Sequence, residues 1–302
     1  MPSKAKILLI YTGGTIGMSK DFETGALKAF NFNKLLQKIP ELKQLDCEIE
    51  TVSYDNPIDS SNMNPDKWTE IALIIEDNYN SFDGFVVLHG SDTMSYSASA
   101  LSFMLENLAK PVIFTGSQLP IGDLRTDAKE NLITAIQIAS LQENGKPVIN
   151  EVCLYFEYKL YRGNRTSKVN AEHFKAFTAP NYPELVESGV HLKLNRHLFL
   201  PINTDAKLIV HKKLDNHVAI IKMFPGMSEI VFAGILTIPG LKGIVLETDG
   251  SGNAPTEDWF LNAIKKAIQS GIHIVNVTQC SGGSVNMGQY ETSTELKQLG
   301  II

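Results

Sequence analysis

Residues 7–18, with the sequence "ILLIYTGGTIGM", indicate the fold class. An apolar run reaches Tyr11 and is followed at once by two threonines, Thr12 and Thr15, that bracket two glycines. A continuous apolar run is typical of a strand that is buried on both faces of a parallel sheet. Glycines let the chain turn tightly after such a strand. The stretch therefore predicts a buried first strand that ends in a turn carrying hydroxyl groups.

Working outward, similar apolar runs recur along the first half of the chain and predict further strands, at residues 48–54, 85–88, 112–115 and 152–156. Helical patterns lie between them, and the first has Asn64 as an N-cap candidate with Pro65 at the first helical position. Alternating strands and helices favour a doubly wound α/β domain with a mostly parallel sheet.

The pattern dissolves between about residues 182 and 207 and then resumes. Strands are expected at 218–223, 243–247 and 272–277, and helices at 228–236 and 257–269. A chain of 302 residues is long enough for two domains. We therefore expect a larger N-terminal catalytic α/β domain, a connecting segment and a smaller C-terminal α/β domain, at 1–186, 187–207 and 208–302. The chain ends on the apolar sequence Gly-Ile-Ile, which reads as the start of another element, so the C-terminal domain is expected to be truncated.

Composition argues against several classes of protein. With 43% hydrophobic and 20% charged residues the chain is an ordinary globular protein, and a net charge of -6 without a basic run disfavours binding to nucleic acid or to an anionic membrane. Three widely separated cysteines suit a reducing compartment. The N-terminal apolar stretch is too short for a signal peptide, and no apolar run is long enough to span a membrane. These features predict a soluble cytoplasmic protein.

Candidate chemistry lies in the loops that follow the predicted strands. In an open parallel sheet, ligands bind at the carboxyl ends of the strands, near a switch in strand order. The polar residues expected at this edge are Thr12 and Thr15; Asp59, Ser60 and Ser61; Ser91, Asp92 and Thr93; Ser117 and Gln118; and, after the fifth strand, Arg165 and Lys168.

Each loop also has an ordinary structural explanation. The Thr-Gly-Gly-Thr sequence can be a turn with capping hydroxyls, and Ser91 with Asp92 can cap the next helix. Lys168 alone would be a solvated surface lysine, and the Asp59 segment alone a plain loop. Four hydroxyl-bearing loops at one sheet edge nevertheless favour a binding or catalytic site.

Other common chemistries lack their motifs. The chain has neither of the glycine-rich phosphate-binding loops and no G-x-S-x-G nucleophile elbow. The seven histidines show no metal-ligand spacing, and His89 is expected to make structural hydrogen bonds. A hydroxyl nucleophile would then need another base, and a lysine oriented by a carboxylate is the obvious candidate.

Seven motifs, in this order and spacing, resemble the type I (cytoplasmic) bacterial L-asparaginases: "YTGGTIGM", "DSSNM", "HGSDTMSYSASALSFMLENL", "KPVIFTGSQLP", "LYRGNRTSK", "GSGNAP" and "VTQCSGG". The resemblance covers nearly the whole chain. It implies an amidohydrolase that converts L-asparagine to L-aspartate and ammonia through an acyl-enzyme, with no metal or organic cofactor. It also implies a homodimer or homotetramer.

The resemblance assigns roles to individual residues. Thr15 is implied as the nucleophile, and Ser91 as a second hydroxyl with Asp92 beside it and Lys168 as its basic partner. Asp92 would also accept the α-ammonium group of the substrate. The loop formed by Asp59, Ser60 and Ser61 would bind the substrate's α-carboxylate, and backbone N–H groups would stabilise the oxyanion.

This sequence departs from the family pattern in four places. Ser91 stands where threonine is usual, and Ala26 stands where some relatives carry a tyrosine that activates the nucleophile, which leaves Tyr290 as a possible substitute. Cys280 matches an allosteric asparagine site known in some members, but Glu247 stands where that site has arginine. Relatives also continue past Ile302.

Two other functions stay open from the sequence. One is an inactive or regulatory amino-acid-binding homologue, against which the retention of Thr15, Ser91, Asp92 and Lys168 argues. The other is an amidotransferase-type subunit that releases ammonia. That version has an extra N-terminal domain, whereas this sequence starts directly at the first predicted strand.

Overall fold

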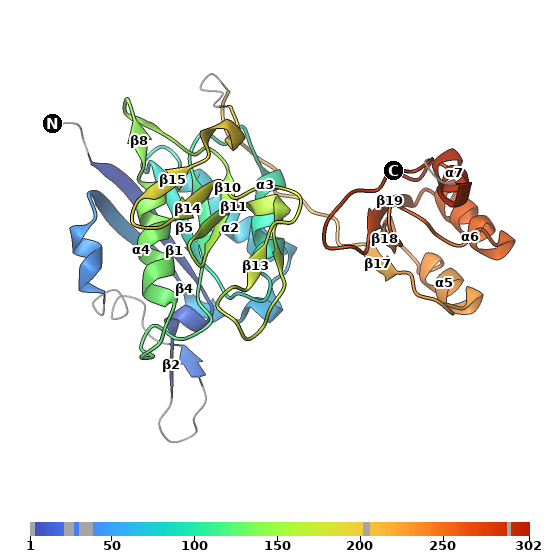
Figure 1. Cartoon of the computed structure of the whole chain (residues 1–302), viewed down its shortest axis with the longest axis horizontal. Coiled ribbons are helices and arrows are strands. Elements are labelled where there is room, and N and C mark those ends of the chain that lie inside the picture. The colour runs from blue at the N-terminus through green and yellow to red at the C-terminus, as the bar shows by residue number, and fades with distance from the viewer. Residues whose placement is uncertain (1–3, 21–26, 30–38, 202–205, 289–290) are drawn as a thin grey trace. The chain divides into compact units, whose positions relative to one another are not determined.

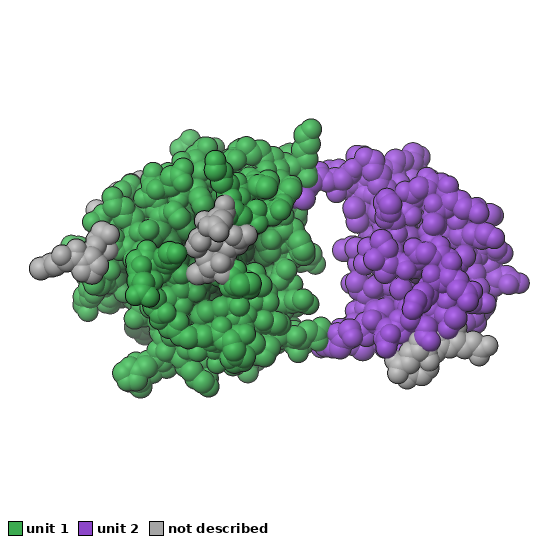
Figure 2. Space-filling view, turned by 90° about the horizontal axis from the view of Figure 1, so that it is seen from above, with its two compact units in different colours: residues 1–213 green, residues 214–302 purple. Residues whose placement is uncertain are grey.

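The computed structural model describes residues 4–20, 27–29, 39–201, 206–288 and 291–302. The chain forms two compact units, Met1–Lys213 and Leu214–Ile302, which Figure 2 colours separately. Each unit has its own hydrophobic core.

The first unit is built on an eight-stranded sheet (Figure 1). In spatial order its strands are β4 (Cys47–Ile58), β1 (Ala5–Gly13), β5 (Gly84–Leu88), β7 (Val112–Thr115), β10 (Val152–Phe156), β11 (Lys159–Arg162), β14 (Val186–Ser188) and β15 (Leu192–Leu194). The five strands from β4 to β10 pair in parallel, and β11, β14 and β15 extend the sheet by antiparallel pairing.

The strand order reverses at β1. The chain leaves β1 for β4 on one side and then crosses to β5 on the other side, and both neighbours run parallel to β1. A ligand crevice is expected outside the carboxyl ends of the two strands that flank such a reversal. In this chain those ends lead into the turn at Thr15 and the loop at Ser91.

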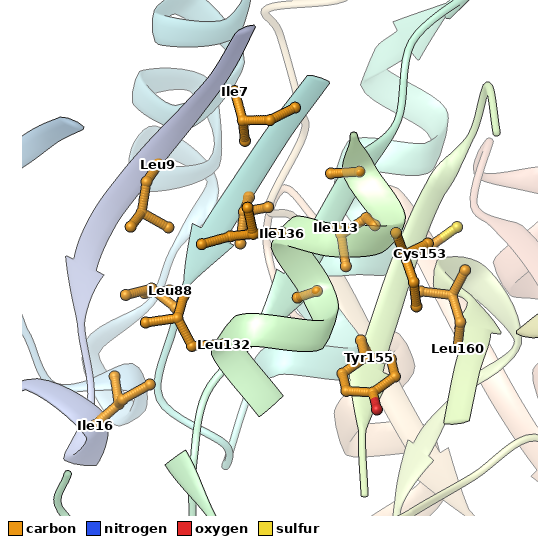
Figure 3. Close-up of a cluster of buried hydrophobic side chains, with 14 of the residues drawn as sticks. Ile7, Leu9, Ile16, Leu88, Ile113, Leu132, Ile136, Cys153, Tyr155 and Leu160 are labelled. Atoms are coloured by element: carbon orange, nitrogen blue, oxygen red, sulfur yellow. The ribbon is translucent and has the colours of Figure 1, made fainter. Parts of the chain in front are cut away.

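Helices cover both faces of the sheet. On one face, Leu132 and Ile136 of α4 (Ala128–Ala139) point toward a fully buried cluster that includes Leu9 of β1 and Ile113 of β7 (Figure 3). The other face is covered by α2 (Pro65–Asn78) and α3 (Met94–Met104). Successive residues of each central strand pack alternately into the hydrophobic clusters on the two faces of the sheet. This is why the sequence shows unbroken apolar runs.

The described part of the segment expected to connect the domains, and the residues just after it, contribute structure to the first unit. β14 and β15 form an antiparallel hairpin that extends the large sheet, and β16 (Ile209–Val210) pairs with β6 (Leu105–Glu106). The strands are only two or three residues long, so they leave no periodic signal in the sequence. The first unit accordingly reaches Lys213, beyond the expected boundary at 186.

The loop with Lys168 does not follow the last parallel strand directly, as the sequence suggested. β10 turns through Glu157 and Tyr158, which have φ of 45° and 66°, into the antiparallel strand β11. Lys168 lies afterwards on β12 (Ser167–Lys168), paired with β13 (Phe177–Thr178). The sequence does not mark this turn, because the turn contains no glycine, asparagine or proline.

Smaller elements complete the first unit. They are the 3-10 turns η1 (Thr15–Gly17), η2 (Pro40–Gln44), η3 (Ser60–Asn62), η4 (Gly163–Arg165) and η5 (Arg196–Leu198), and the ribbons of β2 (Met18–Lys20) with β3 (Leu27–Ala29) and β8 (Gln142–Glu143) with β9 (Lys146–Pro147).

The second unit is a smaller α/β structure. Its parallel strands, in order, are β17 (Val218–Lys222), β18 (Gly243–Thr248) and β19 (His273–Thr278), and its helices are α5 (Glu229–Leu236), α6 (Asp258–Gln269) and α7 (Glu291–Gln298). One face of this sheet contributes buried residues to the core, whereas Ile220 and Val275 on alternate positions are exposed.

The fold class is therefore confirmed: a larger, mostly parallel α/β unit precedes a smaller α/β unit. The predicted start of α2 is confirmed as well, because the Asn64 side chain accepts a hydrogen bond from the amide of Lys67 at 3.1 Å. Among the described residues, no helix is both long and apolar enough to cross a membrane.

Candidate active site

Two of the predicted loops meet through their glycines. Gly14, directly before Thr15, has φ of 88°, and a β-carbon placed on it would lie 2.5 Å from the backbone nitrogen of Gly90. Gly90 in turn directly precedes Ser91. The backbone of the Thr15 turn therefore lies against the backbone of the Ser91 loop, and only glycine permits this approach.

The Ser60 loop joins them. A β-carbon on Gly90 would lie 2.5 Å from Ser60 Oγ, and the carbonyl of Ser60 accepts a hydrogen bond of 2.7 Å from Thr93 Oγ1. Ser60 is only 4% exposed. The loops after β1, β4 and β5 thus converge at one edge of the sheet, as the sequence predicted.

Thr12 and Thr15, the two threonines of the opening stretch, differ in their surroundings. Thr12 is buried, and its hydroxyl donates to the carbonyl of Leu88 at 2.9 Å, which ties the end of β1 to the end of β5. Thr15 begins η1 and is partly exposed. Thr12 therefore holds the two strands together, whereas Thr15 is the more accessible of the two threonines.

Ser91, Asp92 and Lys168 form one hydrogen-bonded group. The Lys168 ammonium donates to Ser91 Oγ at 2.9 Å and to Asp92 Oδ1 at 2.7 Å. Ser91 is 8% exposed and the Lys168 side chain 16%, whereas the Asp92 side chain is 68% exposed. A lysine so placed can exchange a proton with the serine hydroxyl while the carboxylate orients it.

Asp59 organises its own loop. Its Oδ1 accepts hydrogen bonds from the amide of Ser61 at 3.0 Å and from the hydroxyl of Ser61 at 2.9 Å. Both side chains lie on the exposed side of the loop. The Asp59 carboxylate would repel a carboxylate ligand. Hydroxyl and backbone N–H donors around Asp59 would therefore have to bind such an anion.

His89 is a structural residue, as expected. Its Nδ1 donates to the carbonyl of Gly90 at 2.7 Å, since a carbonyl can only accept, and its Nε2 therefore accepts from Ser97 Oγ at 2.8 Å. Trp68 Nε1 donates to the same hydroxyl at 2.8 Å. Burial lowers the pKa of His89 to about 4, against the smaller opposite effect of the Gly90 hydrogen bond. The neutral ring fixes the backbone one residue before Ser91.

Gln118, one of the polar residues that the sequence places at this edge, contacts Ser91 directly. Its Oε1 accepts from Ser91 Oγ at 3.1 Å. The signal for it was present, because Gln118 follows β7 at the same edge of the sheet as the other loops. No local property of a glutamine shows that it will contact a serine 27 positions away.

A cavity of about 530 Å³ adjoins this group. Its lining is rich in hydroxyls and is formed by Asp92, Ser95, Tyr96, Ser99, Thr166, Ser167 and Lys168. Within the described part of the chain, no group of three His, Cys, Asp or Glu side chains is arranged to hold a metal ion.

Family models match both units: residues 6–199 match the model described as "Asparaginase, N-terminal", and residues 217–302 match the "Glutaminase/Asparaginase C-terminal domain". The chain belongs to the asparaginase family.

Known relatives agree with this assignment. The chain is 42% identical over 300 residues to L-asparaginase 1 of Escherichia coli, covering 99% of this chain and 87% of the relative. It is 38% identical to the mouse 60 kDa lysophospholipase, covering 100% of this chain but 56% of that protein. The crystal structure of L-asparaginase I from Vibrio cholerae matches with a TM-score of 0.89 at 40% identity, over 99% of this chain and 88% of that one.

Four further residues concern the departures from the family pattern. Ala26 and Tyr290 lie outside the described residues. Glu247 lies on β18 between the buried Leu246 and Thr248, so its side chain is on the opposite face of the strand. Cys280, after β19, is exposed.

Proposed function

We propose that this chain hydrolyses L-asparagine to L-aspartate and ammonia. One observation carries the proposal: Lys168 bridges Ser91 and Asp92 at the sheet edge where the Ser91 loop lies against the turn of Thr15. The site thus brings together two hydroxyls, an amine and a carboxylate. These are the groups that acyl transfer without a histidine requires.

In the first half of the reaction, Thr15 Oγ attacks the side-chain amide carbon of the substrate. A C–O bond forms, the threonine proton passes to the amide nitrogen, and the C–N bond breaks to release ammonia. Backbone N–H groups of the converging loops stabilise the negative charge on the amide oxygen. The product of this step is an acyl-enzyme on Thr15.

In the second half, a water molecule attacks the acyl carbon. The bond to Thr15 Oγ breaks, the threonine recovers a proton, and aspartate leaves. Ser91 and Lys168 form the proton-transfer pair for these steps, because the neutral amine of Lys168 can take up the serine proton and return it. Asp92 orients Lys168 and accepts the α-ammonium group of the substrate.

The substrate α-carboxylate is bound by the Ser60 and Ser61 loop. Asp59 shapes this loop by accepting hydrogen bonds from both the amide and the hydroxyl of Ser61. No cofactor takes part in this scheme. We further propose that the protein is a cytoplasmic homodimer or homotetramer, as the resemblance to type I enzymes implies.

Ammonia release from asparagine and from glutamine by the purified chain tests the function. We expect asparagine turnover by the wild type. We expect a loss of about 10⁴-fold in kcat for both Thr15→Ala and Ser91→Ala, because removing one member of a group that acts as a unit removes most of the catalysis. Ser91→Thr should keep activity, since it retains the hydroxyl. Ser81→Ala, at an exposed serine after α2, is the matched control.

The alternatives predict different results. A regulatory homologue would bind asparagine without releasing ammonia. An ammonia-releasing amidotransferase subunit would prefer glutamine. Substantial turnover by both alanine variants would contradict the assignment of the site.

A further inference from the structure

We propose that Gln118 is a positioning residue that holds the proton of Ser91 away from Lys168 in the resting site and fixes the loop that follows Lys168. The inference rests on the proposed function. It concerns a side chain for which that function supplies no role.

The hydrogen bonds around Ser91 have only one consistent direction. A hydroxyl donates one hydrogen bond. The Lys168 ammonium has no lone pair and cannot accept that hydrogen bond. Lys168 therefore donates to Ser91 Oγ, and the proton of Ser91 is directed to Gln118 Oε1. In this arrangement Ser91 presents a lone pair, and no proton, to its basic partner.

The orientation of the Gln118 amide follows from its other end. Nε2 lies 3.1 Å from the carbonyl oxygen of His173 and 3.4 Å from that of Ala171. Two carbonyls demand an NH₂ group, so the oxygen of the amide faces Ser91. The assignment of oxygen and nitrogen is thus fixed by chemistry.

The same contacts hold the segment next to Lys168. Residues 169–176 leave and re-enter the ribbon of β12 and β13, and the amide of Val169 donates to the carbonyl of Ala176 at 2.7 Å. Within this loop the Asn170 side chain accepts from the amides of Glu172 and His173, each at 2.8 Å. Gln118 is therefore a direct link between Ser91 and the loop that begins beside Lys168.

The backbone of Gln118 is itself held. Its amide and that of Leu119 donate to the carboxylate of Asp127, and Asn131 Nδ2 donates to Asp127 as well. Asp127 directly precedes α4, so these bonds fix the main chain of Gln118 to the start of that helix. The Gln118 side chain therefore starts from a fixed position relative to both of its partners.

A proton transfer from Ser91 to Lys168 then has a defined order. Lys168 must first lose a proton, and the Ser91 O–H must rotate from Gln118 Oε1 toward the neutral amine. The O–H bond breaks, a new N–H bond forms on Lys168, and the electron pair stays on the serine oxygen. Gln118 sets the starting orientation of the Ser91 O–H bond for this rotation.

Two substitutions separate the parts of the proposal. Gln118→Met keeps the length of the side chain and removes every hydrogen bond. Gln118→Glu keeps an oxygen for Ser91, removes the donors to Ala171 and His173, and places a negative charge near Lys168. Gln137→Met, on the exposed side of α4, is the control.

In Gln118→Met the Ser91 O–H loses its fixed starting orientation and the loop after Lys168 loses its tether. We therefore expect kcat to fall about tenfold while KM changes by less than about twofold. For Gln118→Glu we expect the rise of kcat with pH to move to higher pH, because a nearby carboxylate favours the charged form of an amine. In both variants trypsin should cleave faster after Lys175, which is exposed in the tethered loop.

A kcat within twofold of the wild type in Gln118→Met, together with an unchanged pH profile in Gln118→Glu, would overturn the proposal. A loss of folded protein with unchanged kcat per folded molecule would show a merely structural role and overturn it equally. If the wild type releases no ammonia, the proposed function fails. The trypsin comparison still tests the tether in that case, since it needs no activity.

Discussion

Gly14 and Gly90 touch backbone to backbone at the point where the chain presents Thr15 and Ser91. A β-carbon on Gly14 would lie 2.5 Å from the nitrogen and 2.6 Å from the α-carbon of Gly90. We predict that Gly14→Ala separates the two loops and lowers kcat by about a hundredfold, since a displacement of about 1 Å in a catalytic site can cost that much.

Gly145→Ala is a matched control for this substitution. Gly145 also has a positive φ, 73°, but nothing lies within 4 Å of the position of its β-carbon. Gly14 has φ of 88° and ψ of 169°, a region essentially restricted to glycine, so Gly14→Ala also adds about 1–3 kcal/mol of backbone strain, and kcat is compared per folded molecule. Only Gly14→Ala should lose activity. Equal kcat values for the two folded variants would show that the contact between the glycines is not needed.

Lys168 provides the second prediction. Lys168→Met keeps the length of the side chain but removes the amine that contacts Ser91 and Asp92. We expect kcat to fall by about 10²–10⁴-fold, the range for loss of a general acid or base. The steady-state rate of ammonia release measures this, with the exposed Lys175→Met as control. Retention of more than half of the wild-type kcat would remove Lys168 from the mechanism.

The third prediction concerns a buried ion pair between Glu151, directly before β10, and Arg162, at the end of β11. Glu151, whose side chain is 4% exposed, accepts hydrogen bonds of 2.5 and 3.1 Å from Arg162, and the amide of Leu200 also donates to it. Glu151→Gln leaves the Arg162 charge buried without its counter-charge. We expect the free energy of unfolding of the first unit to fall by about 3 kcal/mol. Replacing both residues by leucine should cost less than that.

Tryptophan fluorescence can isolate the first unit in this measurement. The chain has two tryptophans, Trp68 in the first unit and Trp259 in the second. In a Trp259→Phe background, urea unfolding followed at Trp68 reports the first unit alone. A change below about 0.5 kcal/mol for Glu151→Gln would contradict the prediction.

His89 gives a prediction about pH. Burial lowers its pKa from 6.5 to about 4 in the folded chain, whereas in the unfolded chain it returns to its ordinary value. Between these values the unfolded chain binds more protons, so the free energy of unfolding falls as the pH drops from about 6.5 to about 4. The loss reaches about 3 kcal/mol, and His89 adds no pH dependence above this window.

The comparison of His89→Gln with the wild type tests this sign. The variant should show a smaller loss of unfolding free energy between pH 7 and pH 4.5, because glutamine does not titrate. His191→Gln, at an exposed position, should follow the wild type. Parallel curves for His89→Gln and the wild type would show that His89 is not held neutral.

Much of the fold could be predicted from local patterns. The central strands are buried on both faces, so the sequence shows them as apolar runs. Asn64 could be predicted as an N-cap because its side chain can accept a hydrogen bond from a free backbone amide in the first turn of a helix. The antiparallel extension by β11, β14 and β15 could not be predicted. Those strands are short and pair with residues that the sequence does not mark.

The site was predictable where position along a strand decides it. Thr15, Ser60 and Ser91 follow parallel strands that flank or adjoin the reversal at β1, so topology alone brings them together. Lys168 reaches Ser91 by a route through β11 and β12 that sequence reasoning did not foresee. Gln118 depends on the rotamer of one side chain and on carbonyls of a distant loop, which no local pattern encodes.

The last prediction concerns regulation through the second unit. The resemblance to type I enzymes implies that Glu247 stands where the allosteric asparagine site of some members has arginine. An arginine guanidinium can bind a ligand carboxylate with two hydrogen bonds. A carboxylate at this place would repel that ligand by an energy on the order of kcal/mol in a partly buried setting. The side chain of Glu247 lies on the face of β18 opposite to the buried Leu246 and Thr248.

We therefore expect initial rates to depend hyperbolically on asparagine concentration. Glu247→Arg introduces a positive charge that can bind a ligand carboxylate. If the rest of the effector site is intact, this variant should show cooperative kinetics. Glu172→Arg, in an exposed loop of the first unit, makes the same change in net charge without touching β18. A sigmoidal curve for the wild type that Glu247→Arg leaves unchanged would show that an effector binds without this position, and that the charge at Glu247 does not decide the regulation.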